Sequence, residues 1–267
     1  MRNLRMFVSA VVAVLFVCPI AGAQTPAKPD PQTAKAEQVV ARAVSMVGGD
    51  AYLRASNSVG QGKLSMLQKG RIGSYMSFTD IIVFPDRERT DFEERGSKTV
   101  QVNTGDTGWI YEEHLERFGP QTEKQIEGFK QSIRTGYDHL LKGHWKGKAE
   151  LSFVGRRPST LGKRNDVVKL EFADGFWVEY EFDDEGTPMK TVFASKGSDD
   201  LDVQEELRFG RFLRSGGILY PSVVDRYTNG VHIYRATYES MEYNKRLPDD
   251  IFVKPDDPKK LRKKLKV

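Results

Sequence analysis

The chain has 267 residues, of which 41 are Lys or Arg and 37 are Asp or Glu, so its formal net charge is +4. This length is sufficient for one large hydrophobic core. The only cysteine is Cys18, so the remainder of the chain has to fold without disulfides and offers no thiolate ligand to a metal.

The N-terminus has the three parts of a secretory signal peptide. A basic start is followed by the almost continuously apolar residues 6–20 and by Ala-Gly-Ala at residues 21–23, which is a small-residue cleavage site. The apolar run is shorter than the ~20 residues that cross a bilayer, which favours cleavage after Ala23 over an uncleaved anchor. A valine precedes Cys18, so lipidation there is not expected. The sequence predicts a signal peptide at residues 1–23 and a periplasmic mature protein.

Composition divides the remainder into three parts. Residues 24–32 are rich in proline and polar residues and predict a linker, residues 33–255 predict a single domain, and residues 256–267 form a basic tail. Seven Lys or Arg lie between residues 254 and 267 against two Asp, a local charge of +5. A solvated, disordered tail is favoured over its alternative, contact with an anionic membrane surface. Export makes nucleic acid an improbable partner.

Two helices are expected. Asp30 and Pro31 suit the N-cap and first position of a helix that ends at Gly48 and Gly49. Its apolar stripe has helical spacing and consists of Ala36, Val39, Val40, Ala43, Val44 and Val47. Thr122 and Gln125 form a capping box for the second helix. Its stripe, which stops at Gly143, is Ile126, Phe129, Ile133, Tyr137 and Leu140.

Elsewhere apolar residues recur at every second position, which predicts strands separated by Gly, Pro-Asp and Asn-Gly turns. Strands are expected near residues 62–67, 75–84, 88–94, 99–103, 108–112, 168–172, 176–182, 190–194, 203–213, 219–227 and 231–243. Asn229-Gly230 is the strongest hairpin signal, because a type I′ turn needs positive φ at both central residues. The predicted fold class is mainly β (α+β): a curved antiparallel half-barrel of about ten strands, with helices covering the concave face.

Such a half-barrel offers a pocket for an apolar ligand, unless its aromatic side chains pack against one another and the helices. The expected lining is Phe78, Ile82, Phe84, Trp109, Tyr111, Leu170, Phe172, Phe176, Val178, Tyr180 and Phe182, with the stripe of the second helix (Ile126, Phe129, Ile133, Tyr137 and Leu140) as a lid.

No motif for an enzyme, a cofactor or a metal is present. The glycines of residues 60–62 and 105–108 lie in turns and lack the context of phosphate-binding loops. His139 and His144 flank the end of the predicted second helix, where satisfied or solvent-facing side chains are expected rather than ligands. We therefore expect no catalytic residue, no metal and no cofactor.

The order of several segments resembles the periplasmic lipoprotein carriers of the Lol type, the outer-membrane lipoprotein-sorting proteins. The matching stretches are Val47-Gly48-Gly49-Asp50, residues 81–89 (IIVFPDRER), 103–109 (NTGDTGW), 182–188 (FDDEGTP), 208–212 (RFGRF), 217–221 (GILYP), and 239–244 (ESMEYN) with 247–255 (LPDDIFVKP). The resemblance covers residues 36–255, and the order of the segments carries it.

The resemblance implies a half-open antiparallel barrel whose cavity shelters lipid or lipoprotein acyl chains without catalysis. Arg89 is the nearest match to a cavity-gating arginine of the carriers, and its alternative is an outward arginine on a wet strand face. The same fold also serves as an envelope sensor or protein-interaction module, so a membrane-protein partner in the envelope is the alternative function.

Overall fold

The computed structural model describes residues 30–159, 162–196, 201–248 and 250–262. The predicted signal peptide, most of the predicted linker and the last residues of the basic tail lie outside the described residues. No helix in these ranges is long and apolar enough to cross a bilayer.

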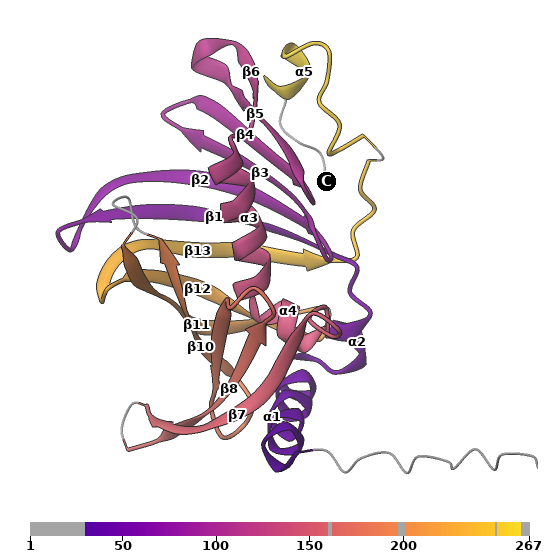
Figure 1. Cartoon of the computed structure of the whole chain (residues 1–267). Helices are drawn as coiled ribbons and strands as arrows, with labels where there is room; N and C mark the ends of the chain where they lie inside the picture. Colours follow the sequence, from indigo (N-terminus) through magenta and orange to yellow (C-terminus); the bar gives the residue numbers. More distant parts are fainter. Residues whose placement is uncertain (1–29, 160–161, 197–200, 249, 263–267) are drawn as a thin grey trace, which may run out of the picture.

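One antiparallel sheet of 13 strands makes up most of the molecule (Figure 1). The strands are β1 (Asn57–Gln68), β2 (Arg71–Val83), β3 (Arg87–Glu94), β4 (Ser97–Thr104), β5 (Thr107–Glu112), β6 (Arg117–Pro120), β7 (Ala149–Pro158), β8 (Arg164–Phe172), β9 (Trp177–Phe182), β10 (Pro188–Lys196), β11 (Asp202–Ser215), β12 (Ile218–Thr228) and β13 (Val231–Tyr243). The predicted curved antiparallel half-barrel is confirmed: the sheet curves and does not close.

The spatial order of the strands is β6-β5-β4-β3-β2-β1-β13-β12-β11-β10-β9-β8-β7. Neighbours are therefore consecutive in sequence except at one place, where β1 pairs with β13. Short turns connect most of the neighbours, and Asn229 and Gly230 have the positive φ values of 48° and 77° that their hairpin requires. The result is two wings, β2 to β6 and β7 to β12, joined along the β1–β13 pair.

Two strands are additional to those predicted. β6 has four residues and contains Gly119 and Pro120, too short a segment for alternation to be visible. β7 is an edge strand interrupted by Gly155 at a register shift. Both sit at the edges of the sheet, where pairing on one side only requires less regular sequence.

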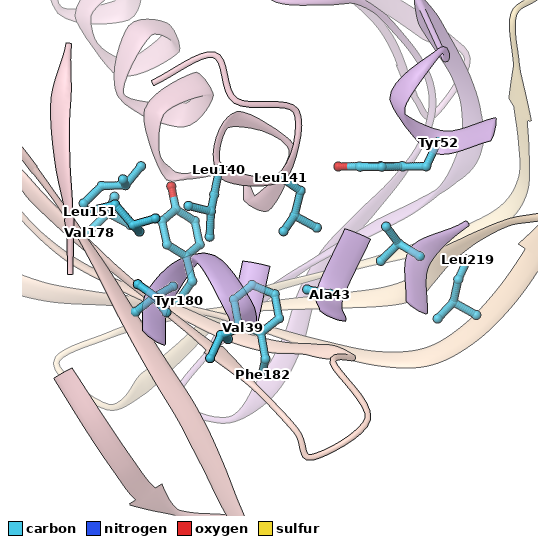
Figure 2. Close-up of a cluster of buried hydrophobic side chains, with 14 of the residues drawn as sticks. Val39, Ala43, Tyr52, Leu140, Leu141, Leu151, Val178, Tyr180, Phe182 and Leu219 are labelled. Carbon is cyan, nitrogen blue, oxygen red and sulfur yellow. The ribbon is translucent and has the colours of Figure 1, made fainter. Parts of the chain in front are cut away.

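Helix α1 (Pro31–Val47) begins as predicted, because the Asp30 carboxylate accepts hydrogen bonds from the backbone N–H of Gln32 and Thr33. The helix therefore already includes the last two residues of the predicted linker 24–32. Its buried stripe, Ala36, Val39, Ala43 and Val47, belongs to the main core, where α1 contacts β7, β8, β12 and the short helix α4 (Tyr137–Leu141) (Figure 2). A short helix, α2 (Asp50–Leu53), follows and adds the buried Tyr52.

Helix α3 (Glu123–Thr135) has the predicted capping box between Thr122 and Gln125. The predicted helix continued to Gly143, whereas the structure interrupts it at Gly136, whose ψ of 136° is extended. Because of this break, the two ends of the predicted stripe have different surroundings. Phe129 and Ile133 stay on α3, while Tyr137 and Leu140 belong to α4, which packs into the main core.

The chain after β13 runs along the sheet on the side opposite α3, toward β6 (Figure 1). We call residues 245–248 and 250–261 the C-terminal strap. Ile251 packs on Val59 and Ile81, while Leu261, in the helical turn α5 (Lys259–Arg262), packs on β4 and β5. The expectation of a disordered tail from residue 256 is therefore wrong as far as Leu261, because apolar side chains on this face of the sheet need a cover.

Replacing Leu261 with alanine should lower the free energy of unfolding by about 2 kcal/mol, since it leaves a cavity over Val100, Val102 and Tyr111. Urea denaturation measures the change, with Lys260→Ala on the exposed side of the same turn as the control. Equal stability of the two variants would show that the strap is not docked in solution.

Candidate functional site

Helix α3 lies across the concave face of the sheet and is attached to both wings (Figure 1). On one side Lys130 pairs with Asp106 of the β4–β5 turn at 2.6 Å. On the other, Arg134 makes two 2.8 Å hydrogen bonds to Asp174 of the β8–β9 turn, and these lower the pKa of Asp174 to about 2. Such exposed ion pairs stabilise by at most about 1 kcal/mol each. Two hydrogen bonds add to these pairs: the Tyr180 hydroxyl donates to the Arg134 carbonyl at 2.7 Å, and the Gln131 side-chain amide donates to the Ala194 carbonyl at 3.3 Å. The helix is thus held over the sheet by a small number of ion pairs and hydrogen bonds.

A cavity of about 210 Å³ lies between α3, α4 and strands β2 and β3. Its apolar lining is Ile82, Phe84, Pro85, Phe129 and Ile133, and the ring of Tyr238 from β13 closes one side. For comparison, an engineered apolar cavity of ~150 Å³ stays dry and binds benzene. The space therefore has the size and the wall of a site for a small apolar group.

Two acids from β2 and β3 line the same cavity, the buried Asp80 and the half-buried Glu88. Asp80 is 8% exposed and accepts a 3.0 Å hydrogen bond from Thr90. Burial raises the pKa of Asp80 to about 6, against the effect of that hydrogen bond. Burial also raises the pKa of Glu88 to about 8, and the neighbouring Asp80 adds to the rise. At neutral pH, Glu88 is therefore mostly a neutral carboxylic acid.

His139 lines the cavity from α4 and is 7% exposed. Neither ring nitrogen has a hydrogen-bond partner among the described residues. Burial lowers the pKa of His139 to about 4, with His144, Lys148 and Arg134 adding to the effect, so the ring is neutral. The expectation of a satisfied or solvent-facing histidine is therefore wrong for His139.

An open groove of about 950 Å³ lies on the other side of α3, toward β10 and β11. Its lining contains six basic and five acidic side chains, with Phe172, Phe176 and Ile133 as the apolar exceptions. The guanidinium of Arg134 lies 4.0 Å from the Phe172 ring centroid and 4.5 Å from that of Phe176. Ile133 and His139 line both spaces, so the cavity and the groove meet at these two side chains.

The structure places the predicted lining residues in several different surroundings. Ile82, Phe84, Phe129 and Ile133 line the cavity, and Phe172, Phe176 and again Ile133 line the groove. Phe78 is buried edge-on against Tyr238, and Ile126 is half-buried on α3. The remaining residues on the concave side lie in the filled core with α1 and α4: Leu170, Val178, Tyr180, Phe182, Tyr137 and Leu140 (several are labelled in Figure 2). In the wing β7 to β12, these predicted lining residues therefore pack against one another and the helices and do not line a pocket.

Trp109 and Tyr111 lie on the wrong face for a cavity under α3. Trp109 pairs with Val102, and Val102 pairs with Arg89, so these three side chains share one face of the sheet. Glu88, which lines the cavity, precedes Arg89 in β3 and therefore points to the opposite face. Trp109 donates a 3.0 Å hydrogen bond to the Phe252 carbonyl, and Tyr111 is fully buried beside Leu261. The C-terminal strap covers both.

Arg89 also faces the strap. Its Nε lies 2.7 Å from the Asp91 carboxylate, and its Nη1 donates a 2.9 Å hydrogen bond to the Ile251 carbonyl. The side chain is 5% exposed. Arg89 is therefore neither a cavity gate nor an outward arginine on a wet face; it fastens the strap to the sheet.

Sequence reasoning missed the polar members of the site: Asp80, Glu88, His139 and Tyr238. A signal existed for Asp80, since Phe78, Asp80, Ile82 and Phe84 have even spacing and share one face of β2 and its end. A carboxylate within an otherwise apolar face indicates a buried acid. No comparable pattern marks His139, whose burial depends on how α4 packs.

No protein-family model and no curated protein sequence matches the chain. Solved structures do match. A DUF1329 family protein from Desulfovibrio piger has a TM-score of 0.59 at 13% identity, over 81% of this chain and 96% of that one. A LolA superfamily protein from Nitrosomonas europaea has a TM-score of 0.56 at 14% identity, over 81% and 97%.

A third match is described as an outer membrane lipoprotein-sorting protein domain from Vibrio parahaemolyticus. It has a TM-score of 0.55 at 12% identity, over 85% of this chain and 99% of that one. At such identities the likeness concerns the fold alone. The open antiparallel sheet crossed by α3 is thus the Lol-type lipoprotein-sorting fold.

Proposed function

We propose that this chain is a periplasmic, non-enzymatic carrier that holds an acyl chain of a lipid or lipoprotein beneath α3. The observation that carries the proposal is a helix laid over the concave face of the sheet, with a cavity on one side and a groove on the other. Each buried CH₂ group is worth about 0.8 kcal/mol, so apolar walls are enough to bind an acyl chain and no catalytic group is needed.

The way in which α3 is attached supports this function. Within α3 only Phe129 and Thr135 are buried. Its links to the wings are the ion pairs to Asp106 and Asp174 and the hydrogen bonds that join it to Tyr180 and Ala194. A lid held in this way can lift to admit a chain without unfolding the core around α1. The predicted export and the fold shared with a lipoprotein-sorting domain are consistent with a cargo that crosses the envelope.

Protein purified from its native host should carry lipid, and mass spectrometry of an organic extract identifies it. The purified protein should also take up a fluorescent fatty acid. Ile133→Asp places a carboxylate where the cavity and the groove meet, so we expect it to weaken uptake at least about tenfold, or ~1.4 kcal/mol.

Ile72→Asp is the matched control, because Ile72 is 66% exposed near the β1–β2 turn and lines neither space. It should bind like the unmodified protein. If no lipid is extracted and no fatty acid is taken up, the carrier function is wrong. Capture of an envelope membrane protein by both variants alike would then favour the interaction module.

A further inference from the structure

The cavity is lined by more polar groups than the binding of an acyl chain requires. Three carboxyl groups line it: Asp80 from β2, Glu88 from β3 and Asp138 from α4. Asp138 accepts a 2.5 Å hydrogen bond from the Tyr52 hydroxyl, and Asp80 accepts one from Thr90. Glu88 pairs through its backbone with β2 and β4, but its carboxyl group makes no hydrogen bond or ion pair with any described residue. Burying such groups is costly unless something compensates for the lost water.

His139 is an independent observation at the same place. Its ring is more than nine-tenths buried, it lines the cavity, and both nitrogens lack a partner in the described part of the chain. A neutral imidazole has one donor and one acceptor nitrogen. Leaving both unpaired costs about 1 to 3 kcal/mol for each group, and a ligand with polar hydrogens would satisfy the acceptor nitrogen.

Within the described lining, no cation is directed at Asp80 or Glu88, whereas Asp138 interacts electrostatically with Lys142. Arg87 is the one guanidinium among the lining residues, and it lies 5.1 Å from the centroid of the Phe252 ring, on the strap side of the sheet. The ammonium of nearby Lys142 donates to the backbone carbonyls of Tyr52 and Ala55. The carboxyls of Asp80 and Glu88 are therefore left without a positive partner.

Aromatic rings complete the site. Phe84, Phe129 and Tyr238 line the same cavity as the two acids. Aromatic faces attract cations electrostatically, by about 0.5 to 2 kcal/mol depending on how far the cation is desolvated. Carboxylates, an unpaired imidazole and aromatic rings together match one kind of head group, a positively charged nitrogen that donates hydrogen bonds.

We propose that the cavity beneath α3 recognises the ammonium group of a cationic amphiphile, with Asp80 and Glu88 as its acceptors and His139 as a further hydrogen-bond partner. The inference rests on the proposed function and specifies its ligand class: the alkyl chain lies against Ile82, Phe129 and Ile133. It continues past Ile133 into the groove, since that side chain lines both spaces.

Binding of an ammonium group should release protons. An adjacent positive charge favours the ionised form of a carboxyl, and Glu88 is mostly protonated at neutral pH in the free protein. The titratable groups that face the two acids from packed elements are Tyr234 and Tyr238 of β13, Asp138 and His139 of α4, and His144. None of these is a cation at neutral pH, since burial also lowers the pKa of His144.

The test is isothermal titration calorimetry of the purified protein with dodecylamine, dodecanol and dodecyl sulfate, each below its micelle concentration. At neutral pH dodecylamine should bind at least about tenfold more tightly than the other two. Titration in buffers of different ionisation enthalpy should show about one proton released per amine and none for dodecanol. This second measurement needs no variant and so does not depend on a variant folding.

The double variant Asp80→Asn, Glu88→Gln should bind dodecylamine and dodecanol with nearly equal affinity. Glu93→Gln is the control, because Glu93 is exposed on β3 and points away from the cavity. Equal binding of all three head groups by the unmodified protein, or a preference for the sulfate, overturns the head-group inference and leaves the carrier function standing. Failure of all three to bind overturns the carrier function itself.

Discussion

Val178→Asp should unfold the domain rather than empty the cavity. Val178 is fully buried in β9, opposite Leu170 on one side and Phe193 on the other, and belongs to the core that α1 fills (Figure 2). An ionised carboxylate at this position has no partner and no water. We expect a loss of about 3 to 5 kcal/mol in the free energy of unfolding, a large part of the stability of an ordinary domain.

Circular dichroism during urea denaturation measures this loss. Val231→Asp is the matched control, because Val231 is 56% exposed at the start of β13 and the same change there should cost little. If Val178→Asp keeps the unmodified stability and loses only fatty-acid uptake, the core assignment of β9 is wrong and Val178 lines the ligand site after all.

The second large effect is a dependence of stability on pH. In the unfolded chain Asp80 and Glu88 have ordinary pKa values near 3.9 and 4.3, whereas burial raises the folded values to about 6 and about 8. Well below pH 4 both carboxyl groups are protonated in the folded and in the unfolded protein, so they do not lower the free energy of unfolding. As the pH rises toward about 8 the unfolded chain is already ionised while the folded protein resists ionisation, so stability falls.

Glu88→Gln should therefore raise the free energy of unfolding by roughly 2 kcal/mol at pH 8 and by clearly less at pH 5. Urea denaturation across this pH range measures both values, with Glu93→Gln as the control that should follow the unmodified protein. Parallel curves for Glu88→Gln and the unmodified protein would mean that Glu88 is not buried in solution.

Interactions between residues close in sequence were sufficient to predict most of the fold. The Thr122 capping box, the Asp30 cap and the Asn229-Gly230 turn are interactions between residues close in sequence, and all three form as predicted. Period-two alternation depends only on which residues of a strand share a face. Together these features specify hairpins in succession, and a long succession of hairpins with one apolar face has to curve.

The candidate site was harder to predict from the sequence, because the alternation of apolar residues does not indicate which face of the sheet a helix will cover. Trp109 and Tyr111 are apolar at alternating positions, like Ile82 and Phe84, yet the strap covers the first pair and the second lines the cavity beneath α3. The strap itself consists of isolated apolar residues without periodicity. Its docking depends on contacts between residues more than 140 positions apart, such as Trp109 with Phe252.

The pairing of β1 with β13 determines when the site comes into existence. Each wing is a run of local hairpins, but Ser58 pairs with Tyr243, so the central pair joins nearly the two limits of the domain. Contacts this distant in sequence are slow to form. The cavity needs Tyr238 of β13 as well as β2, β3, α3 and α4. A chain that emerges N-terminus first during its synthesis therefore lacks this cavity until almost all of it is available, so strand order alone excludes early binding there.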